Sequence, residues 1–153
     1  MINIKNAEAA TSVGQITDVV IGNAKNLALS GTYIAPSGIG ATAGTWTSAT
    51  ADPGMGTITP KDITASADGI LKTYTALVIP QDMKGKKFLA VTLSDNQVYY
   101  YTPSDSDANL KSGQVYTYNI TVKIGKIDVI AVNNGSGSWG SSGSEDITSS
   151  STP

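Results

Sequence analysis

The chain of 153 residues contains no cysteine and no histidine, and all ten of its basic residues are lysine, so arginine is absent as well. Without cysteine there is no thiolate nucleophile, thiolate metal site or disulfide framework. Without histidine, the sequence lacks the imidazole group best suited to proton transfer near neutral pH. Without arginine, it lacks the guanidinium group that binds phosphate or carboxylate through two hydrogen bonds. An enzyme is therefore the weakest class of function, and we predict no catalytic residue, cofactor or metal site.

A surplus of positive charge is also absent. Charged residues make up only 14% of the chain, and the formal net charge is -2. Surfaces that bind nucleic acid are normally basic, so we predict no nucleic-acid partner. No run approaches the roughly 18 consecutive apolar residues of a membrane-spanning helix, so we predict no transmembrane segment.

Residues 1–5 contain no apolar h-region, so we expect no signal peptide in this chain. Serine, threonine and glycine fill much of the sequence where other proteins carry charge. Such uncharged, hydroxyl-rich surfaces are common on extracellular and cell-surface β proteins. Either the protein is cytosolic or a targeting signal was removed from this chain, and we favour removal.

One short motif partly matches a calcium-binding loop. Asp105, Asp107 and Asn109 match the first three ligand positions of a calcium loop. The match then fails, because Leu110 stands where the turn requires glycine and Tyr116 stands where a bidentate glutamate is expected. Side chains of this kind often cap the local backbone at the end of a strand, which is the interpretation we adopt.

The clearest structural pattern lies in residues 113–122. Tyr116, Tyr118, Ile120 and Val122 are large and apolar or aromatic, and the residues between them are mostly polar. A period of two buries one face of a strand and exposes the other to water. Most of these residues are β-branched or aromatic and fit a pleated surface. We predict one long amphipathic strand packed on a core.

Further strand-like segments recur between turn residues. They are residues 15–21, 27–34 with a bulge at Gly31, 44–47, two short strands within 56–64, 73–79, 87–94, 97–102 and 127–132. Asp95-Asn96 is predicted to be a two-residue hairpin turn. Roughly seven to nine strands at this spacing, with little or no helix, indicate an all-β fold, a two-layer antiparallel β-sandwich. We predict one domain over 1–132 and a Gly/Ser-rich tail or terminal strand segment over 133–153.

Two groups of aromatic residues leave alternatives open. Tyr99 and Tyr101 share one face of their predicted strand, which either packs in the core or forms a platform for stacking a sugar. Trp139 is the one large aromatic residue after 132, and it either packs on its own domain, anchors a partner or belongs to a free tail.

The order of these motifs resembles the C-terminal domain of the fimbrillin family of Bacteroidetes surface proteins. The resemblance covers roughly Val13 to Trp139. It rests on Ile79-Pro80-Gln81 after an apolar strand, the hairpin 88–102, the pattern G-x-x-Y-x-Y-N-[IL]-x-V at 113–122, the strand 127–132 before a tryptophan, and Gly44-Thr45-Trp46 upstream. Family members usually carry two such domains and a lipobox cysteine, whereas this chain has room for one domain and no cysteine.

The resemblance implies a transthyretin-like sandwich, export as a lipoprotein to the outer membrane or fimbrium, and a role as a pilus subunit or adhesin. It implies that subunits join by β-strand addition, in which a groove left by an N-terminal strand accepts a strand of the next subunit. The matching partner-binding residues are Ile127, Val129, Ala131 and Trp139. Partners would be pilus subunits, further copies of the chain, or a host glycan or protein.

The alternative hypothesis is a glycan- or protein-binding β-sandwich that does not polymerise. In that case Tyr99 and Tyr101 are the candidate ligand-binding residues.

Overall fold

The computed structural model describes residues 1–6, 16–37, 44–64, 71–123 and 126–136. The described chain is all β, with one short 3-10 turn, η1 (Asp105–Ala108). The predicted fold class, a two-layer β-sandwich, is confirmed. No helix in these ranges is long and apolar enough to span a membrane.

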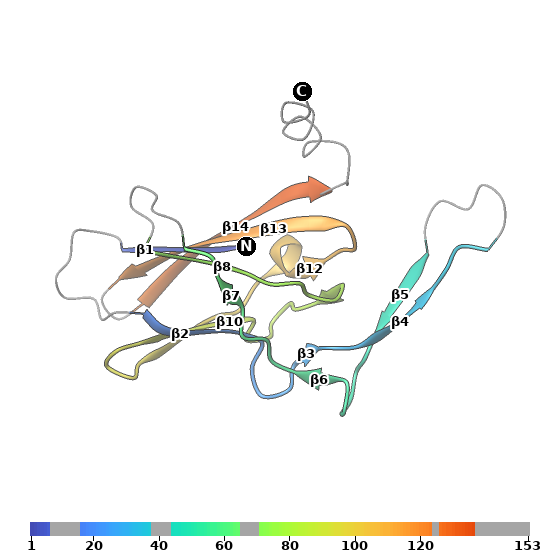
Figure 1. The fold of residues 1–153 in the computed structure, drawn as a ribbon, viewed down its shortest axis with the longest axis horizontal. Helices are drawn as coiled ribbons and strands as arrows, with labels where there is room; N and C mark the ends of the chain where they lie inside the picture. The colour runs from blue at the N-terminus through green and yellow to red at the C-terminus, as the bar shows by residue number, and fades with distance from the viewer. Residues whose placement is uncertain (7–15, 38–43, 65–70, 124–125, 137–153) are drawn as a thin grey trace, which may run out of the picture.

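The larger layer is a five-stranded sheet in the order β14-β13-β1-β8-β7. Its strands are β14 (Lys126–Ser136), β13 (Gln114–Lys123), β1 (Ile2–Asn6), β8 (Lys72–Thr75) and β7 (Lys61–Asp62). All neighbours pair antiparallel except β1 and β13, which run parallel. Figure 1 shows the two long strands, β13 and β14, along the upper side of the body.

The second layer is a three-stranded sheet in the order β11-β10-β2. Its strands are β11 (Val98–Tyr101), β10 (Leu89–Leu93) and β2 (Ile16–Ile21). The core lies between the layers. Leu89, Val91 and Leu93 point into it from β10, as their alternation predicts, and Tyr118, Ile120 and Val122 point into it from β13.

Three two-stranded ribbons complete the described chain. They are β12 (Asn109–Leu110) with β9 (Gln81–Asp82), β3 (Leu27–Ala28) with β6 (Met55–Gly56), and β4 (Gly31–Ile34) with β5 (Thr45–Ser48). The β4–β5 hairpin projects away from the two layers in Figure 1, and we call it the arm.

Segment 27–34 is not the single bulged strand that the sequence predicted. Leu27 and Ala28 are buried and pair with β6, whereas Gly31–Ile34 leaves the body and pairs with β5. Both halves have strand-forming side chains, and the choice of two different partners divides them. No local pattern in the sequence encodes that choice.

The predicted two-residue turn at Asp95-Asn96 is wrong by one residue. Leu93 N donates to Gln97 O at 3.0 Å, so Ser94, Asp95 and Asn96 all lie in the loop. Asn96 adopts a positive φ of 62°, which is the left-handed position of a three-residue hairpin loop and one that asparagine tolerates. The last strand is also longer than the predicted 127–132, since β14 continues to Ser136.

Candidate functional site

The N-terminal strand β1 lies between two strands that do not pair with each other. On one side Ile2 and Ile4 are register partners of Tyr118 and Ile120 of β13, in parallel. On the other side Ile2 is the register partner of Tyr74 of β8, antiparallel. Removing β1 would open the middle of the five-stranded sheet. We call the space that β1 fills the β1 slot.

The apolar side chains of β1 cover the hydrophobic core at the β1 slot. Ile2 is 3% exposed and Ile4 is fully buried, and both belong to the main hydrophobic cluster. Lys5 is exposed, so the strand has one apolar and one polar face. Fully burying an isoleucine is worth about 1.5–3 kcal/mol, so the two isoleucines supply a large part of the energy that holds β1.

Polar contacts fix the register of β1. Asn3 Nδ2 donates to Asn119 Oδ1 at 3.1 Å on the outward face. At the start of the strand, the Met1 amino group donates to Tyr116 O at 2.6 Å, and Tyr118 N donates to Met1 O at 2.9 Å. Burial lowers the pKa of this amino group below its usual value. The parallel pairing therefore continues to the first residue.

An apolar groove continues the slot past Met1. Its volume is about 480 Å³, and residues 75–78 form one wall while residues 110–116 form the other. Residues 76–78 follow β8, and residues 114–116 are the start of β13, so the groove lies between the two strands that flank β1. Leu77, at 96% exposed, and Val115, at 43%, lie at this groove. The site thus offers room for a strand that is longer than β1.

The predicted donor, β14, occupies the outer edge of the same sheet. It pairs with β13 antiparallel from Lys123↔Lys126 to Gln114↔Ser136, with an irregularity near Tyr116. Ile127, Val129 and Ala131 are half-buried against the core, so the structure brings these three predicted residues together on one face. Trp139, the fourth, lies outside the described residues.

The opposite face of β14 carries exposed apolar side chains as well. Ile130 is 67% exposed and Val132 is 40% exposed. Lys123 and Asp128 form an ion pair near the start of the strand, and Asn134 Nδ2 donates to Thr117 Oγ1 at 2.7 Å near its end. The strand is thus held along its inner edge, while its other edge is the border of the sheet in the described part of the chain.

Tyr99 and Tyr101, the candidate ligand-binding residues, both pack against the hydrophobic cluster and are half-buried. The Tyr101 ring lies 5.9 Å from the Tyr118 ring across the two layers, and its hydroxyl lies 3.4 Å from Asp107 Oδ2. Desolvation, with the nearby carboxylate, raises the pKa of Tyr101 to about 12. Tyr100 lies on the outer face, where the Lys87 ammonium lies 4.0 Å from the ring centre.

The structure describes no metal centre: in the ranges it covers, no group of three or more acidic, histidine or cysteine residues is placed to hold an ion. Asp107, part of the calcium-like motif, instead accepts hydrogen bonds near the layer junction, since Tyr118 Oη donates to its backbone oxygen at 3.1 Å.

Strand β1 was not among the strands predicted from the sequence. The signal is present in Ile2-Asn3-Ile4-Lys5, which alternates apolar and polar side chains. The segment is short, and its alternation spans only two periods. Its position between β8 and β13 depends on strands more than 60 residues away, and no local pattern reveals it.

Comparison with known proteins gives one match. A family model described as fimbrillin-like matches residues 1–136, which include every described strand. No curated protein and no solved structure matches the chain.

Proposed function

This chain belongs to the fimbrillin-like family, and from that premise we propose that it is a pilus subunit or adhesin that joins its partners by β-strand addition. The family is structural and non-enzymatic. We further propose that the protein acts at the cell surface, in the outer membrane or fimbrium, and that it is exported as a lipoprotein. Its partners would be other subunits or further copies of itself.

The observation that carries this proposal is the position of β1. A terminal strand of five residues lies between β13 and β8, and an apolar groove extends its slot beyond Met1. A strand from another subunit that takes this place would satisfy the same backbone groups of both neighbours. A longer donor would also cover the groove walls at Leu77 and Val115.

The donor we propose is β14 with the segment after it. Ile127, Val129 and Ala131 alternate on one face, as Ile2 and Ile4 do in β1. Inserted in the β1 slot of a neighbour, they would present the same apolar pattern to its core. Trp139 would then follow as an additional anchor.

Two matched disulfide locks test this exchange, because the chain has no cysteine of its own. Asn119 has Asn3 as its register partner in β1 and Ile130 as its partner in β14. The pair Asn3→Cys and Asn119→Cys locks the slot, so the oxidised protein still donates but cannot accept. The pair Asn119→Cys and Ile130→Cys locks the donor, so the oxidised protein accepts but cannot donate.

Electron microscopy and size-exclusion chromatography supply the measurement. We expect the unmodified chain to form filaments or ladders of oligomers, and each oxidised variant alone to form neither. A mixture of the two should give exchanged pairs but no filaments, and reduction should restore longer assemblies. Filaments or ladders that form from either variant alone in its oxidised state would contradict strand exchange.

A glycan- or protein-binding module that does not polymerise is the alternative, with ligand at Tyr99 and Tyr101. Both rings are half-buried, which leaves little area for stacking. This alternative predicts a monomer retained on immobilised glycans, and lower retention for Tyr99→Ala or Tyr101→Ala.

A further inference from the structure

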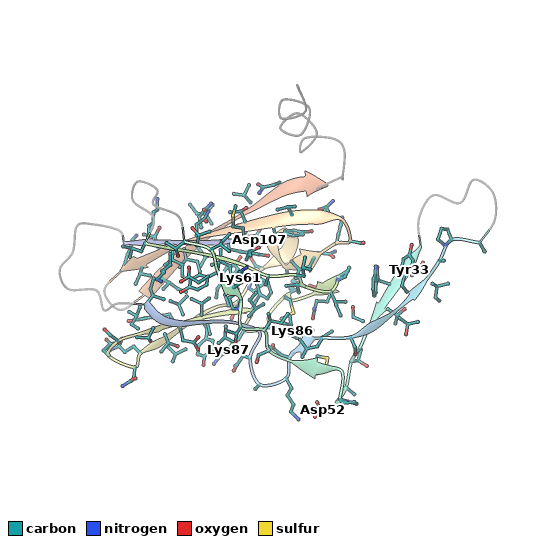
Figure 2. All side chains as sticks on the ribbon, in the orientation of Figure 1. Tyr33, Asp52, Lys61, Lys86, Lys87 and Asp107 are labelled. Carbon is teal, nitrogen blue, oxygen red and sulfur yellow. The ribbon has the colours of Figure 1, made fainter. Side chains whose placement is uncertain are left out.

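The arm has little support from the body. All four residues of β4 are exposed, as are Thr45, Trp46 and Thr47 of β5. The two strands pair only with each other in the described ranges. Figure 2 labels Tyr33 on this hairpin, well away from the side chains gathered between the layers. A two-stranded ribbon alone is marginally stable in water, so such an arm gains from a further strand.

Both faces of the arm carry apolar side chains. On one face Tyr33 and Trp46 are directly opposite, with ring centres 5.3 Å apart and planes tilted by 43°. Gly44 lies beneath the Tyr33 ring, since a Cβ there would come within 2.3 Å of it. On the other face Ile34 is 62% exposed, between threonines. The rings stiffen the hairpin but do not bury it.

The hydrogen-bond pattern shows which backbone groups point outward. Ala49 N donates to Ser30 O at 2.9 Å, so this pair is hydrogen-bonded across the hairpin. Antiparallel pairs alternate, so Gly31 and Tyr33 are non-hydrogen-bonded positions whose own N–H and C=O groups point away from β5. The outer edge of β4 therefore presents the donors and acceptors of Gly31 and Tyr33.

This edge also lacks the usual protection against pairing. Residues 26–51 contain no charged side chain, in a run bounded by Lys25 and Asp52. Natural edge strands are commonly blunted by lysine, other charges, proline or a bulge. None of these falls within Gly31–Ile34, which has regular pairing over its whole length. The edge is therefore open to another strand.

We propose that the arm is a self-association surface, in which β4 of one chain adds antiparallel to β4 of a second copy. Gly31 of each copy would exchange hydrogen bonds with Tyr33 of the other, and Thr32 would face its own copy on a two-fold axis. Such an edge is complementary to itself, as a two-fold contact requires. Because it is uncharged, two copies of a chain with net charge -2 meet there without repulsion between like charges at the contact.

The geometry of this contact is a second reason to expect that the partner of β4 is another copy of the same chain. In this register each Tyr33 lies opposite a glycine, so its ring has space to cover the neighbouring backbone. The Tyr33 and Trp46 rings of both copies would then lie on the same face of a four-stranded ribbon. The contact uses neither β1 nor β14, so it goes beyond the strand exchange proposed above and does not depend on it.

Single cysteines in the full chain test the register. In a non-hydrogen-bonded antiparallel pair the Cα atoms are about 4.5 Å apart, within the range of a disulfide. We expect Thr32→Cys to give a disulfide-linked dimer on mild oxidation. Thr47→Cys is the matched control, because Thr47 is an exposed threonine directly opposite Thr32 in the hairpin. Its copy would lie about 14 Å away, three strand spacings, which is too far to link.

The outcomes separate this contact from its rivals. A linked dimer of Thr32→Cys, with Thr47→Cys unlinked, supports the proposal. Linkage through Thr47→Cys, or through neither cysteine, overturns it. If the unmodified chain forms filaments but Thr32→Cys gives no linked dimer, the arm contact is overturned and strand exchange stands. If Thr32→Cys gives linked dimers but the unmodified chain forms no filaments, strand exchange is overturned and the arm contact stands.

A charge exchange at the same residue gives a second test that needs no oxidation. Thr32 is exposed and remote from the core, so its replacement should leave the fold intact. We expect Thr32→Lys alone and Thr32→Glu alone to lose arm pairing, because each places like charges on the two-fold axis. An equal mixture should recover association in sedimentation. A mixture that associates no better than either variant alone overturns the two-fold register.

Discussion

Individual residues of β1 divide sharply between core and solvent. Ile4 is fully buried beside Ile120, whereas its neighbour Lys5 is exposed. The retention of β1 in its slot therefore depends on two isoleucines and on backbone pairing, and a change in one side chain should alter it measurably.

Ile4→Ala should destabilise the protein by about 2–5 kcal/mol, because it removes buried methyl groups and leaves a cavity. Urea unfolding followed by circular dichroism measures this loss. Lys5→Ala, one residue along on the exposed face, should change the free energy of unfolding by no more than about 0.5 kcal/mol. Equal effects of the two substitutions would show that β1 is not packed as described.

The sequence predicted which side chains are buried in strands where apolar and polar residues alternate over many positions. Tyr118, Ile120 and Val122 of β13 are buried as expected, because a strand of ten residues repeats the pattern several times. Thr117 is also buried, at 6% exposed, although its polar side chain predicts exposure. Its hydroxyl accepts a hydrogen bond from Asn134, a contact that only the pairing with β14 creates.

At the scale of elements, the arm is a separate hairpin in which Gly44 packs closely against Tyr33. A Cβ at Gly44 would lie 2.2 Å from the Tyr33 hydroxyl and 2.5 Å from Ile34 O. Any side chain at this position must displace either the tyrosine ring or the hairpin backbone.

Gly44→Ala should therefore move the Tyr33 ring from Trp46 and change the fluorescence of Trp46, measured in a Trp139→Phe background. The free energy of global unfolding should change by no more than about 0.5 kcal/mol, since the arm contributes nothing to the core. Thr45→Ala, adjacent but on the other face, is the control and should leave the fluorescence unchanged. A large loss of global stability in Gly44→Ala would show that the arm is part of the cooperative core.

Elements of two residues were the least predictable. Strands β3, β6, β7, β9 and β12 each have two residues, too few to show a period. They are strands because a neighbour aligns with them. Gln81 of β9, for example, pairs with Leu110 of β12, and its side chain also exchanges hydrogen bonds with the backbone of Ala28, 53 positions earlier.

At the scale of the whole molecule, tyrosines join the two layers. Tyr101 of the smaller sheet meets Tyr118 of the larger one, and the centre of the Phe88 ring lies 5.3 Å from that of Tyr118. Burial is the main reason that the pKa values of Tyr101 and Tyr118 are raised above the usual 10. Folding therefore favours the protonated form of both phenols.

The stability of the sandwich should fall at alkaline pH. Above about pH 10 the unfolded tyrosines lose their protons while the folded ones keep them, so the folded state binds more protons and stability decreases as pH rises. For Tyr101 the fall should extend to about pH 12. Denaturant midpoints between pH 8 and 12 measure it. Tyr101→Phe should make the decline shallower, and an unchanged slope would contradict a buried phenol at the layer junction.

The sequence by itself determined the all-β class, the inward faces of β10 and β13, and the absence of thiol, imidazole and guanidinium groups, because side-chain type and a period of two are local properties. The tertiary structure decided that β1 runs parallel to β13 within the β1 slot, that Tyr99 and Tyr101 pack against the core, and that residues 27–34 divide between body and arm. These outcomes depend on which strands pair with each other. Backbone hydrogen bonds between strands are nearly the same for every residue type, so the choice of partner is settled only when the whole chain packs.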